Sequence, residues 1–463
     1  MMHVDLQKIN NFLFYSIKNY GAIRIFKRIL FFIRRNINNR LTLINTIIFS
    51  FSSPKIKISS TSIIQNYQLN IEESCDLKSI EFTFLNEKKL LKVPFKWNCK
   101  KWSRLWQFNL HYFDWAKSWL EEYIKHSRPN KYFKFIGYLL DDWINNNKIG
   151  TGDGWHSYTI SIRLRNWIWL FIFIPSLITK KRKDSLWRQF IWLRYHLEDD
   201  IGGNHLLENL TALIIGGIFF DSNKADKIFS YSIVRLKKEL DIQILKDGGH
   251  FERSASYHIL ILERLIEVIF LIRLIKKEKN EWLINKITKM SNWLEVIRLE
   301  NGSFPNFNDS CKDACNNIDI ILELVDYYNS DNFKDNEALE LLFLKRYNNN
   351  KKNKELKNNI VNQQSKIKDL PDTGWTFLRP GNGWELIFKN GIPCPKFLPA
   401  HAHSDLLSFN LYKEGEPIFI EAGTSIYGNK MQRFYERSGA AHNIFQIASS
   451  SKEIEEESSS WIE

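Results

Sequence analysis

Two histidines separated by a single residue are the clearest candidates for chemistry in this sequence. They are His401 and His403, in the run Ala-His-Ala-His-Ser-Asp that ends at residue 405. On a β-strand, side chains at i and i+2 point to the same face, which suits a metal or a paired catalytic role. A carboxylate at Glu421 and an imidazole at His442 follow, and such groups can complete a three-ligand zinc site. The alternative interpretation is a set of polar side chains on a solvated strand face.

A second polar cluster lies earlier in the chain. The turn Asp247-Gly248-Gly249 leads into a helix whose first turns would carry Glu252, Ser256 and Tyr257. A tyrosine at such an edge more often serves plain packing than chemistry, so this cluster alone does not assign a role to Tyr257.

A third pair, Asn204-His205, opens another predicted helix after the glycines at 202 and 203. Asn and His side chains together can hold and neutralise a carboxylate. The alternative is an ordinary asparagine N-cap.

These residues must be positioned by two regions of different texture. From about residue 100 to 350, apolar residues return every three or four positions, most clearly over 258–276 and 282–299, and predict helices joined by short loops. After the polar stretch 346–368, strand-like runs over 373–388, 406–412 and 417–421 predict a β domain. The first 60 residues are typical of short basic amphipathic helices, which can touch a membrane surface.

Composition excludes several classes of protein. The chain has 463 residues, 44% hydrophobic and 25% charged, which is ordinary for a globular protein rather than a disordered one. Five scattered cysteines predict neither a disulfide framework nor a zinc cluster. No apolar stretch is long enough to predict a transmembrane helix, and no clear signal peptide is visible. The 14% aromatic residues suit sugar rings or bases, and the net charge of +13 suits an acidic partner, although a general bias toward Lys, Asn and Ile also gives such a charge. No nucleic-acid-binding motif is present.

Taken in order, the motifs resemble the heparinase II/III-like family of polysaccharide lyases over about residues 100 to 450. The run of motifs comprises Gly203-Asn204-His205 with Glu208-Asn209, Asp247-Gly248-Gly249 through Tyr257-His258, Asn301-Gly302 with Pro305 and Asp309, His401 through Asp405, Glu421 through Thr424, and Arg437-Ser438 through His442-Asn443.

The resemblance implies an incomplete (α/α) toroid followed by an antiparallel β-sandwich, with the active site in the cleft between them. We therefore expect an N-terminal basic helical or irregular region over 1–95, the toroid over 96–350, a linker over 351–369 and the β-sandwich over 370–463. Only about 95 residues follow the linker, so we expect this β-sandwich to be incomplete.

The resemblance also implies β-elimination on a uronic-acid-containing polysaccharide. By similarity, Tyr257 is the base, or base and acid, that removes the C5 proton and helps to protonate the leaving oxygen, and His401 is a second catalytic group. Asn204 and His205 hold the uronate carboxylate, and Tyr427 is a weaker catalytic candidate.

The implied cofactor is a structural zinc ion held by His403, Glu421 and His442. The family usually has Asp where this chain has Glu421, whose side chain is one methylene longer and can weaken the site. Trp155, Arg163 and Glu252 are the residues that we expect to contact substrate, by stacking and by charge, although core packing is the alternative for the tryptophan.

Two other functions remain open from the sequence. One is a catalytically silent protein that binds acidic glycans. The other is a glycoside hydrolase on a similar helical toroid, which needs two facing carboxylates such as Glu208 and Glu252. The resemblance implies the bacterial cell envelope or periplasm, whereas the lack of a clear signal peptide leaves the cytoplasm open. The sequence does not name the polysaccharide or the oligomeric state.

Overall fold

The computed structural model describes residues 21–40, 52–57, 68–69, 71–126, 130–311, 318–330, 334, 339, 342, 367–427 and 431–445. The chain divides into two compact units, each of which is described by itself. Unit 1 comprises Met1–Gly21, Lys238–Ile269 and Asn280–Glu463, and unit 2 comprises Ala22–Lys237 and Phe270–Lys279. The predicted boundary between the helical and β regions does not divide these units, because unit 1 contains helices as well as the sheet.

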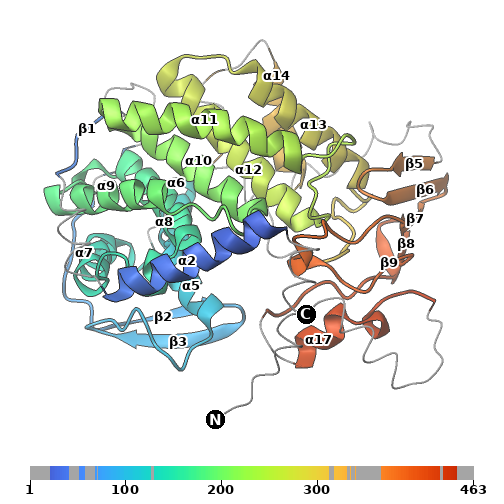
Figure 1. The fold of residues 1–463 in the computed structure, drawn as a ribbon, viewed down its shortest axis with the longest axis horizontal. Helices are drawn as coiled ribbons and strands as arrows, with labels where there is room; N and C mark the ends of the chain where they lie inside the picture. The colour runs from blue at the N-terminus through green and yellow to red at the C-terminus, as the bar shows by residue number, and fades with distance from the viewer. Residues whose placement is uncertain are drawn as a thin grey trace. The chain divides into compact units, whose positions relative to one another are not determined.

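Unit 2 is built mainly of helices, as the periodicity predicts (Figure 1). They are α2 (Ala22–Arg40), α5 (Arg104–Tyr112), α6 (Asp114–His126), α7 (Ile136–Asn146), α8 (Ser157–Phe173), α9 (Lys180–Tyr195), α10 (Gly203–Phe219) and α11 (Asn223–Gln243), which continues into unit 1.

Helix α8 is the centre of unit 2. It packs against α5, α6, α9 and α10, and nearly all of its side chains are buried. A helix that is apolar on every side is stable only when other elements surround it, so α8 fixes the arrangement of its neighbours.

The region before residue 96 also contains a β-hairpin, which the sequence analysis did not predict. Strands β2 (Ser79–Phe84) and β3 (Glu87–Lys92) pair antiparallel across Leu85 and Asn86, which both have positive φ. Two positive φ values in a two-residue loop match the twist of the hairpin. A further short pair joins β1 (Lys55–Ile56) to β4 (Phe220–Asp221).

Unit 1 combines helices with one antiparallel sheet. Its helices are α12 (Ala255–Leu271), which continues into unit 2, α13 (Glu281–Ile297), α14 (Ile318–Asn329) and α17 (Met431–Arg437). Its strands are β5 (Ile367–Leu370), β6 (Trp375–Gly381), β7 (Trp384–Lys389), β8 (Phe409–Lys413) and β9 (Glu416–Phe419), paired in that order (Figure 1). The described residues form this one five-stranded sheet and no second layer.

Several predicted boundaries can be compared with these elements. The predicted helices over 258–276 and 282–299 are confirmed by α12, with the π-turn that follows it at Ile272–Lys276, and by α13. The predicted linker ends too late, because β5 begins at Ile367. Residues 351–366 of that linker lie outside the described residues.

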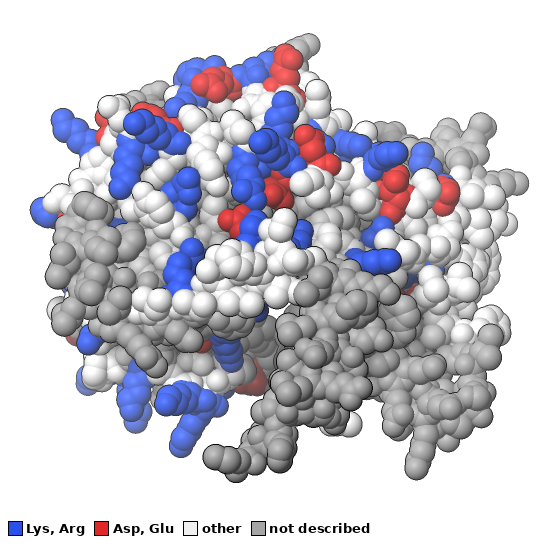
Figure 2. All heavy atoms as spheres, viewed as in Figure 1, with Lys and Arg blue, Asp and Glu red and all other residues white. Residues whose placement is uncertain are grey.

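The described residues also show the surface charge, the state of the cysteines and the character of the longest helices. On the face drawn in Figure 2, Lys and Arg are spread over the described helices with Asp and Glu among them. Cys75, Cys99, Cys311 and Cys394 are free. Among the described helices, none has the length and apolar character needed to cross a membrane.

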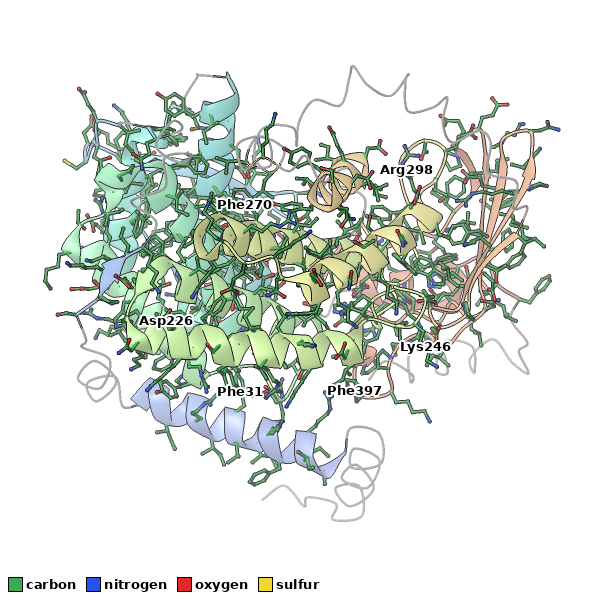
Figure 3. All side chains as sticks on the ribbon, turned by 90° about the horizontal axis from the view of Figure 1, so that it is seen from above. Phe31, Asp226, Lys246, Phe270, Arg298 and Phe397 are labelled. Carbon is green, nitrogen blue, oxygen red and sulfur yellow. The ribbon has the colours of Figure 1, made fainter. Side chains whose placement is uncertain are left out.

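Aromatic residues join the helices of unit 1 to its sheet. The ring centroids of Trp293, on α13, and Trp375, on β6, lie 5.4 Å apart, and Phe307 packs on Trp375 at 5.1 Å. Arg298, labelled in Figure 3, follows α13 and pairs with Asp319 of α14 at 2.6 Å. These contacts hold the segment between α13 and α14 against the sheet.

The Asp-Gly-Gly turn has a structural purpose in unit 1. The Asp247 carboxylate accepts hydrogen bonds from the backbone N–H and the hydroxyl of Thr373. A Cβ atom at Gly248, where φ is +98°, would lie 2.3 Å from the Lys289 carbonyl oxygen, and one at Gly249 would lie 2.3 Å from the Thr373 hydroxyl. Glycine is therefore required for the close packing that places the following residues, including Tyr257.

Candidate functional site

A buried carboxylate, Asp309, is the centre of the candidate site in unit 1. It accepts hydrogen bonds from His401 Nδ1 at 2.9 Å, His403 Nε2 at 2.8 Å, the Thr424 hydroxyl at 2.8 Å and Arg433 Nη2 at 2.7 Å. Burial alone would raise the pKa of Asp309, but the hydrogen bonds from the two histidines and the charge beside it hold that pKa well below its usual value. Asp309 is therefore ionised at neutral pH.

The ionised carboxylate fixes how the two histidines are oriented. It can only accept hydrogen bonds, so His401 must donate from Nδ1 and His403 from Nε2. The opposite nitrogen of His401, Nε2, lies 3.5 Å from Glu252 Oε2. The opposite nitrogen of His403, Nδ1, is buried without a hydrogen-bond partner among the described residues.

The segment around the two histidines is not the strand that the sequence analysis predicted. His401 ends a 3₁₀ turn at Pro399–His401, and His403 lies in the irregular chain that follows. The predicted proximity of the two side chains survives for another reason, because both rings bind the same carboxylate.

Tyr257 lies against this cluster. Its ring centroid is 4.0 Å from that of His401, and its hydroxyl is 3.3 Å from the hydroxyl of Tyr427. Arg433 stacks over the Tyr427 ring at 5.0 Å. Desolvation and then the nearby Asp309 carboxylate raise the pKa of Tyr427, so its hydroxyl keeps its proton and can donate. Tyr257, Tyr427 and His401, all three predicted from the sequence, are brought together.

The start of helix α12 is tied directly to the segment that carries Asp309. The Ser254 hydroxyl donates to the Asp309 carbonyl at 2.8 Å, and the Ala255 backbone N–H donates to the Ser310 hydroxyl at 3.0 Å. Tyr257 is the third residue of this helix. Its position is consequently set by the same segment that orients His401.

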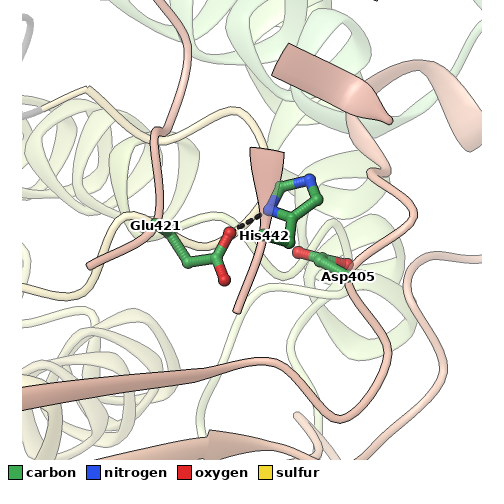
Figure 4. Close-up of side chains that lie close together, drawn as sticks. All are labelled: Asp405, Glu421 and His442. Carbon is green, nitrogen blue, oxygen red and sulfur yellow. Dashed lines mark hydrogen bonds and ion pairs between the residues drawn. The ribbon is translucent and has the colours of Figure 1, made fainter. Parts of the chain in front are cut away.

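A possible metal site adjoins the cluster. Asp405, Glu421 and His442 each offer one ligand atom, and these atoms lie within 4.8 Å of one another (Figure 4). His442 Nδ1 contacts Glu421, whereas His442 Nε2 and one oxygen of Asp405 are buried without a hydrogen-bond partner among the described residues. Burial raises the pKa of Glu421 despite its contact with His442.

The residues around this group offer further ligand atoms, although the buried Lys389 ammonium already pairs with the other oxygen of Asp405. The ring centroid of His403 is 5.3 Å from that of His442, and the unpartnered Nδ1 of His403 carries its lone pair because Nε2–H is donated to Asp309. A carboxylate behind a ligating histidine is a common feature of zinc sites. Three of these side chains were predicted from the sequence. Asp405 is the one that was missed, although it ends the same motif as His403.

A separate cluster in unit 2 holds the predicted residues Asn204 and His205. The buried carboxylate of Glu198 accepts hydrogen bonds from His205 Nδ1 and from Asn209 Nδ2, both at 3.0 Å, and His156 lies 3.8 Å away. Burial would raise the pKa of Glu198, but the charges of His205 and His156 and these hydrogen bonds lower it to about 2.

The two predicted residues differ in their exposure. The Tyr158 ring packs on His205 at 4.4 Å, and the His205 side chain is partly exposed. Asn204 is buried as the second residue of α10, whose N-cap is Gly202 rather than Asn204. Because His205 and Tyr257 belong to different units, their joint action on one substrate stays a prediction.

Two of the residues that were expected to contact substrate, Arg163 and Trp155, lie in the core of unit 2. Arg163 is fully buried: it donates to Gln189 Oε1 at 2.7 Å, the His111 carbonyl at 3.2 Å and the Gly154 carbonyl at 2.7 Å, and it stacks over Trp143 at 3.8 Å. Trp155 is also buried, with its ring nitrogen donating to the Asn147 carbonyl. Both side chains belong to the core of unit 2, because their polar groups are satisfied inside it.

Glu252 needs a similar correction. It is buried beside His401 rather than presented at the surface, so its contact is with a predicted catalytic group. Glu208 is also buried and lies 3.8 Å from Arg165. Neither carboxylate has the accessible position that a hydrolytic acid or base requires.

Comparison with known proteins supports a common origin. The heparinase II/III N-terminus family model matches residues 29–339, and the heparinase II/III-like C-terminal model matches residues 362–458. A heparin-sulfate lyase of Bacteroides thetaiotaomicron is 24% identical over 443 residues, which cover 86% of this chain and 60% of the relative. A heparin-sulfate lyase of Bacteroides stercoris is 23% identical over 263 residues, covering 53% of this chain and 35% of the relative.

A crystal structure of heparinase III gives a TM-score of 0.59 at 20% identity, covering 77% of this chain and 57% of that chain. This likeness confirms the predicted fold class. The chain spans between 35% and 60% of the length of the two curated relatives. Since the N-terminal family model alone covers more than half of the sequence, this chain belongs to the heparinase II/III family.

Proposed function

We propose that the chain is a polysaccharide lyase that cleaves a uronic-acid-containing acidic polysaccharide by β-elimination. The observation that carries this proposal is the contact of Tyr257 with both His401 and Tyr427, beside the buried Asp309. The heparin-sulfate lyases among its relatives support a glycosaminoglycan as the class of substrate.

The chemistry needs a base and a proton donor at one place. In β-elimination a base removes the C5 proton, the electron pair forms a C4–C5 double bond, and the C4–O bond breaks as the leaving oxygen takes a proton. Tyr257 supplies the base, and the same phenol then returns a proton to the leaving oxygen. His401, with Nδ1–H donated to Asp309 and Nε2 3.5 Å from Glu252, is the second catalytic group of this proposal.

Acidifying the C5 proton requires that the adjacent carboxylate be neutralised by preorganised donors. In this proposal Asn204 and His205 supply those donors. Glu198 supports this role, because its buried carboxylate accepts a hydrogen bond from His205 Nδ1 and so fixes the orientation of a partly exposed ring.

The test is an ultraviolet absorbance assay on a panel of acidic polysaccharides, because each elimination leaves a conjugated unsaturated uronate. We expect wild-type activity on at least one uronate polymer and at least about a 100-fold loss in kcat for Tyr257→Phe. Tyr195→Phe is the matched control, since Tyr195 is an exposed residue at the end of α9. New reducing ends without absorbance would instead indicate a hydrolase, and binding without cleavage a silent glycan-binding protein.

We also propose that His403, Asp405, Glu421 and His442 hold a structural zinc ion. When bound, the ion would cross-link the segments that carry these four residues. The support is the set of buried, unpartnered ligand atoms at Asp405, His442 and His403.

Zinc binding to the folded state alone must raise thermal stability. We expect zinc to raise the melting temperature of chelator-treated protein, and His442→Ala to remove that rise. Asp369→Asn, which changes an exposed carboxylate on β5, should retain it. A melting temperature that does not respond to zinc, with no zinc in the purified protein, would contradict the assignment.

A further inference from the structure

Helix α2 shows the reverse of the usual arrangement for a helix on a protein surface. Six of its large apolar side chains are 47% to 74% exposed, and they form one stripe because they recur three or four positions apart. The stripe comprises Ile23, Phe26, Ile29, Leu30, Ile33 and Ile37. A surface helix normally turns such a stripe toward the core and its charged residues toward water.

Basic side chains of α2 bind the rest of unit 2: Arg24 and Arg28 lie opposite the stripe, and Arg34 lies at its edge, four positions after Leu30. Arg28 Nη1 pairs with Asp200 at 2.7 Å, Arg34 Nη1 donates to the Tyr195 carbonyl at 2.8 Å, and Arg24 Nη1 donates to the Ile201 carbonyl at 3.4 Å. These contacts hold the helix by its arginine side chains.

An aromatic contact agrees with this orientation. The ring centroid of Phe31 lies 6.4 Å from that of His156, and Figure 3 shows Phe31 on the side of α2 that faces the neighbouring helices. Other side chains of α2 point away from the body of the unit in the same view. Over α2, the face drawn in Figure 2 shows mainly uncharged side chains.

We propose that α2 is an interfacial helix that binds the surface of an anionic lipid membrane, with this apolar stripe in the boundary between headgroups and acyl chains. An interfacial helix needs an apolar face outward, Lys and Arg nearby, and a polar face that can be held by the protein. Helix α2 has all three features.

Charge decides between a membrane and a second copy of the chain. The sequence of α2 contains six Lys or Arg residues and no Asp or Glu. In a two-fold dimer through the stripe, one basic helix would face another and repel it. Anionic headgroups are complementary to that charge, so lipid is the favoured occupant. This inference is independent of the proposed lyase activity.

The experiment is flotation of the full chain with lipid vesicles. One set contains phosphatidylcholine with about a third phosphatidylglycerol, and the other contains phosphatidylcholine alone. We expect binding to the anionic vesicles, weaker binding to the neutral ones, and release at high salt because exposed charges are screened.

The decisive variant is Ile29→Glu/Ile33→Glu, which places two charges in the stripe at exposed positions. We expect it to lower the vesicle-bound fraction at least about tenfold. Val234→Glu/Ile242→Glu is the matched control, since these exposed apolar residues lie on α11, and it should bind as the wild type does. If the charged pair in α2 prevents folding, as judged by circular dichroism, Ile29→Ser/Ile33→Ser replaces it with the same expected direction.

Three results would overturn the proposal. They are no binding of the wild type to anionic vesicles, equal binding by the wild type and the α2 variant, or a wild-type dimer that the α2 variant converts to a monomer. The last result would place a second copy on the stripe. Lyase activity is measured separately, so its failure does not bear on these outcomes.

Discussion

Asp309→Asn is the substitution that tests most directly how the candidate site is built. It keeps the size of the side chain but removes its charge and one of its acceptor atoms. In the wild type the carboxylate accepts hydrogen bonds from His401, His403, Thr424 and Arg433, with donor–acceptor distances of 2.7 to 2.9 Å. Asparagine can accept only through its single oxygen, so its amide nitrogen would face the donor groups of at least one partner.

The cost is set mainly by Arg433. This guanidinium is buried and contacts Asp309 twice, through Nη1 and Oδ1 at 2.6 Å and through Nη2 and Oδ2 at 2.7 Å. Removing one partner of a buried ion pair costs about 3–5 kcal/mol because the other charge stays buried and uncompensated. We therefore expect Asp309→Asn to lower the free energy of unfolding by roughly 4 kcal/mol, an appreciable share of a typical total of about 5–15 kcal/mol.

Urea unfolding followed by tryptophan fluorescence measures this loss. Asp326→Asn is the control, because Asp326 is an exposed carboxylate on α14, and we expect a change within about 0.5 kcal/mol. The double variant Asp309→Asn/Arg433→Met should recover part of the loss, since it removes the stranded cation. A loss below about 1 kcal/mol for Asp309→Asn, or no recovery in the double variant, would refute the view that this ion pair organises the site.

Two further predictions concern unit 2. The pKa of Glu198 is lowered from 4.5 to about 2, so its ionisation contributes roughly 3 kcal/mol of stability above pH 4.5, and this contribution is lost as the pH falls toward 2. In acid unfolding, Glu198→Gln should therefore lose less stability than the wild type over that range. Equal slopes of stability against pH for the two proteins would contradict the assignment. Arg163→Met should lower the free energy of unfolding by about 3 kcal/mol, since it strands Gln189 and two backbone carbonyls, without changing KM for polysaccharide. A raised KM at unchanged stability would restore Arg163 to the binding site.

The sequence predicts the elements of this protein better than it predicts their contacts. Helical periodicity locates α12 and α13 within a few residues, because the apolar residues that these helices turn toward the core recur with a period of about 3.6. The hairpin β2–β3 was missed, because its second strand, Glu87–Lys92, is largely charged and gives no strand pattern.

Charge in an apolar helix was also misread. Arg163 lies in the run Ile-Ser-Ile-Arg-Leu-Arg and was expected to contact substrate by its charge. Its partners are two backbone carbonyls and Gln189, and a carbonyl acceptor leaves no signature in the sequence. Sequence spacing therefore cannot distinguish a satisfied core arginine from a binding arginine.

In the candidate site, too, the sequence predicted certain residues but not the contacts that orient them. Tyr257, His401 and Tyr427 were predicted through their motifs, whereas the roles of Asp309 and Glu198 were not. A residue that orients a histidine is defined by where the folded chain places it, and Asp309 precedes His401 by 92 positions.

That separation has a consequence for how the protein folds. The contacts of Asp309 with His401, His403, Thr424 and Arg433 close loops that span 92, 94, 115 and 124 residues. Closing such long loops costs chain entropy before the contacts that stabilise them have formed. Helices, whose contacts are local, therefore form earlier. On the ribosome the cluster cannot assemble until Arg433 has emerged, more than a hundred residues after Asp309. The candidate site is consequently among the last parts of the native structure to form, and a partly folded chain cannot orient His401.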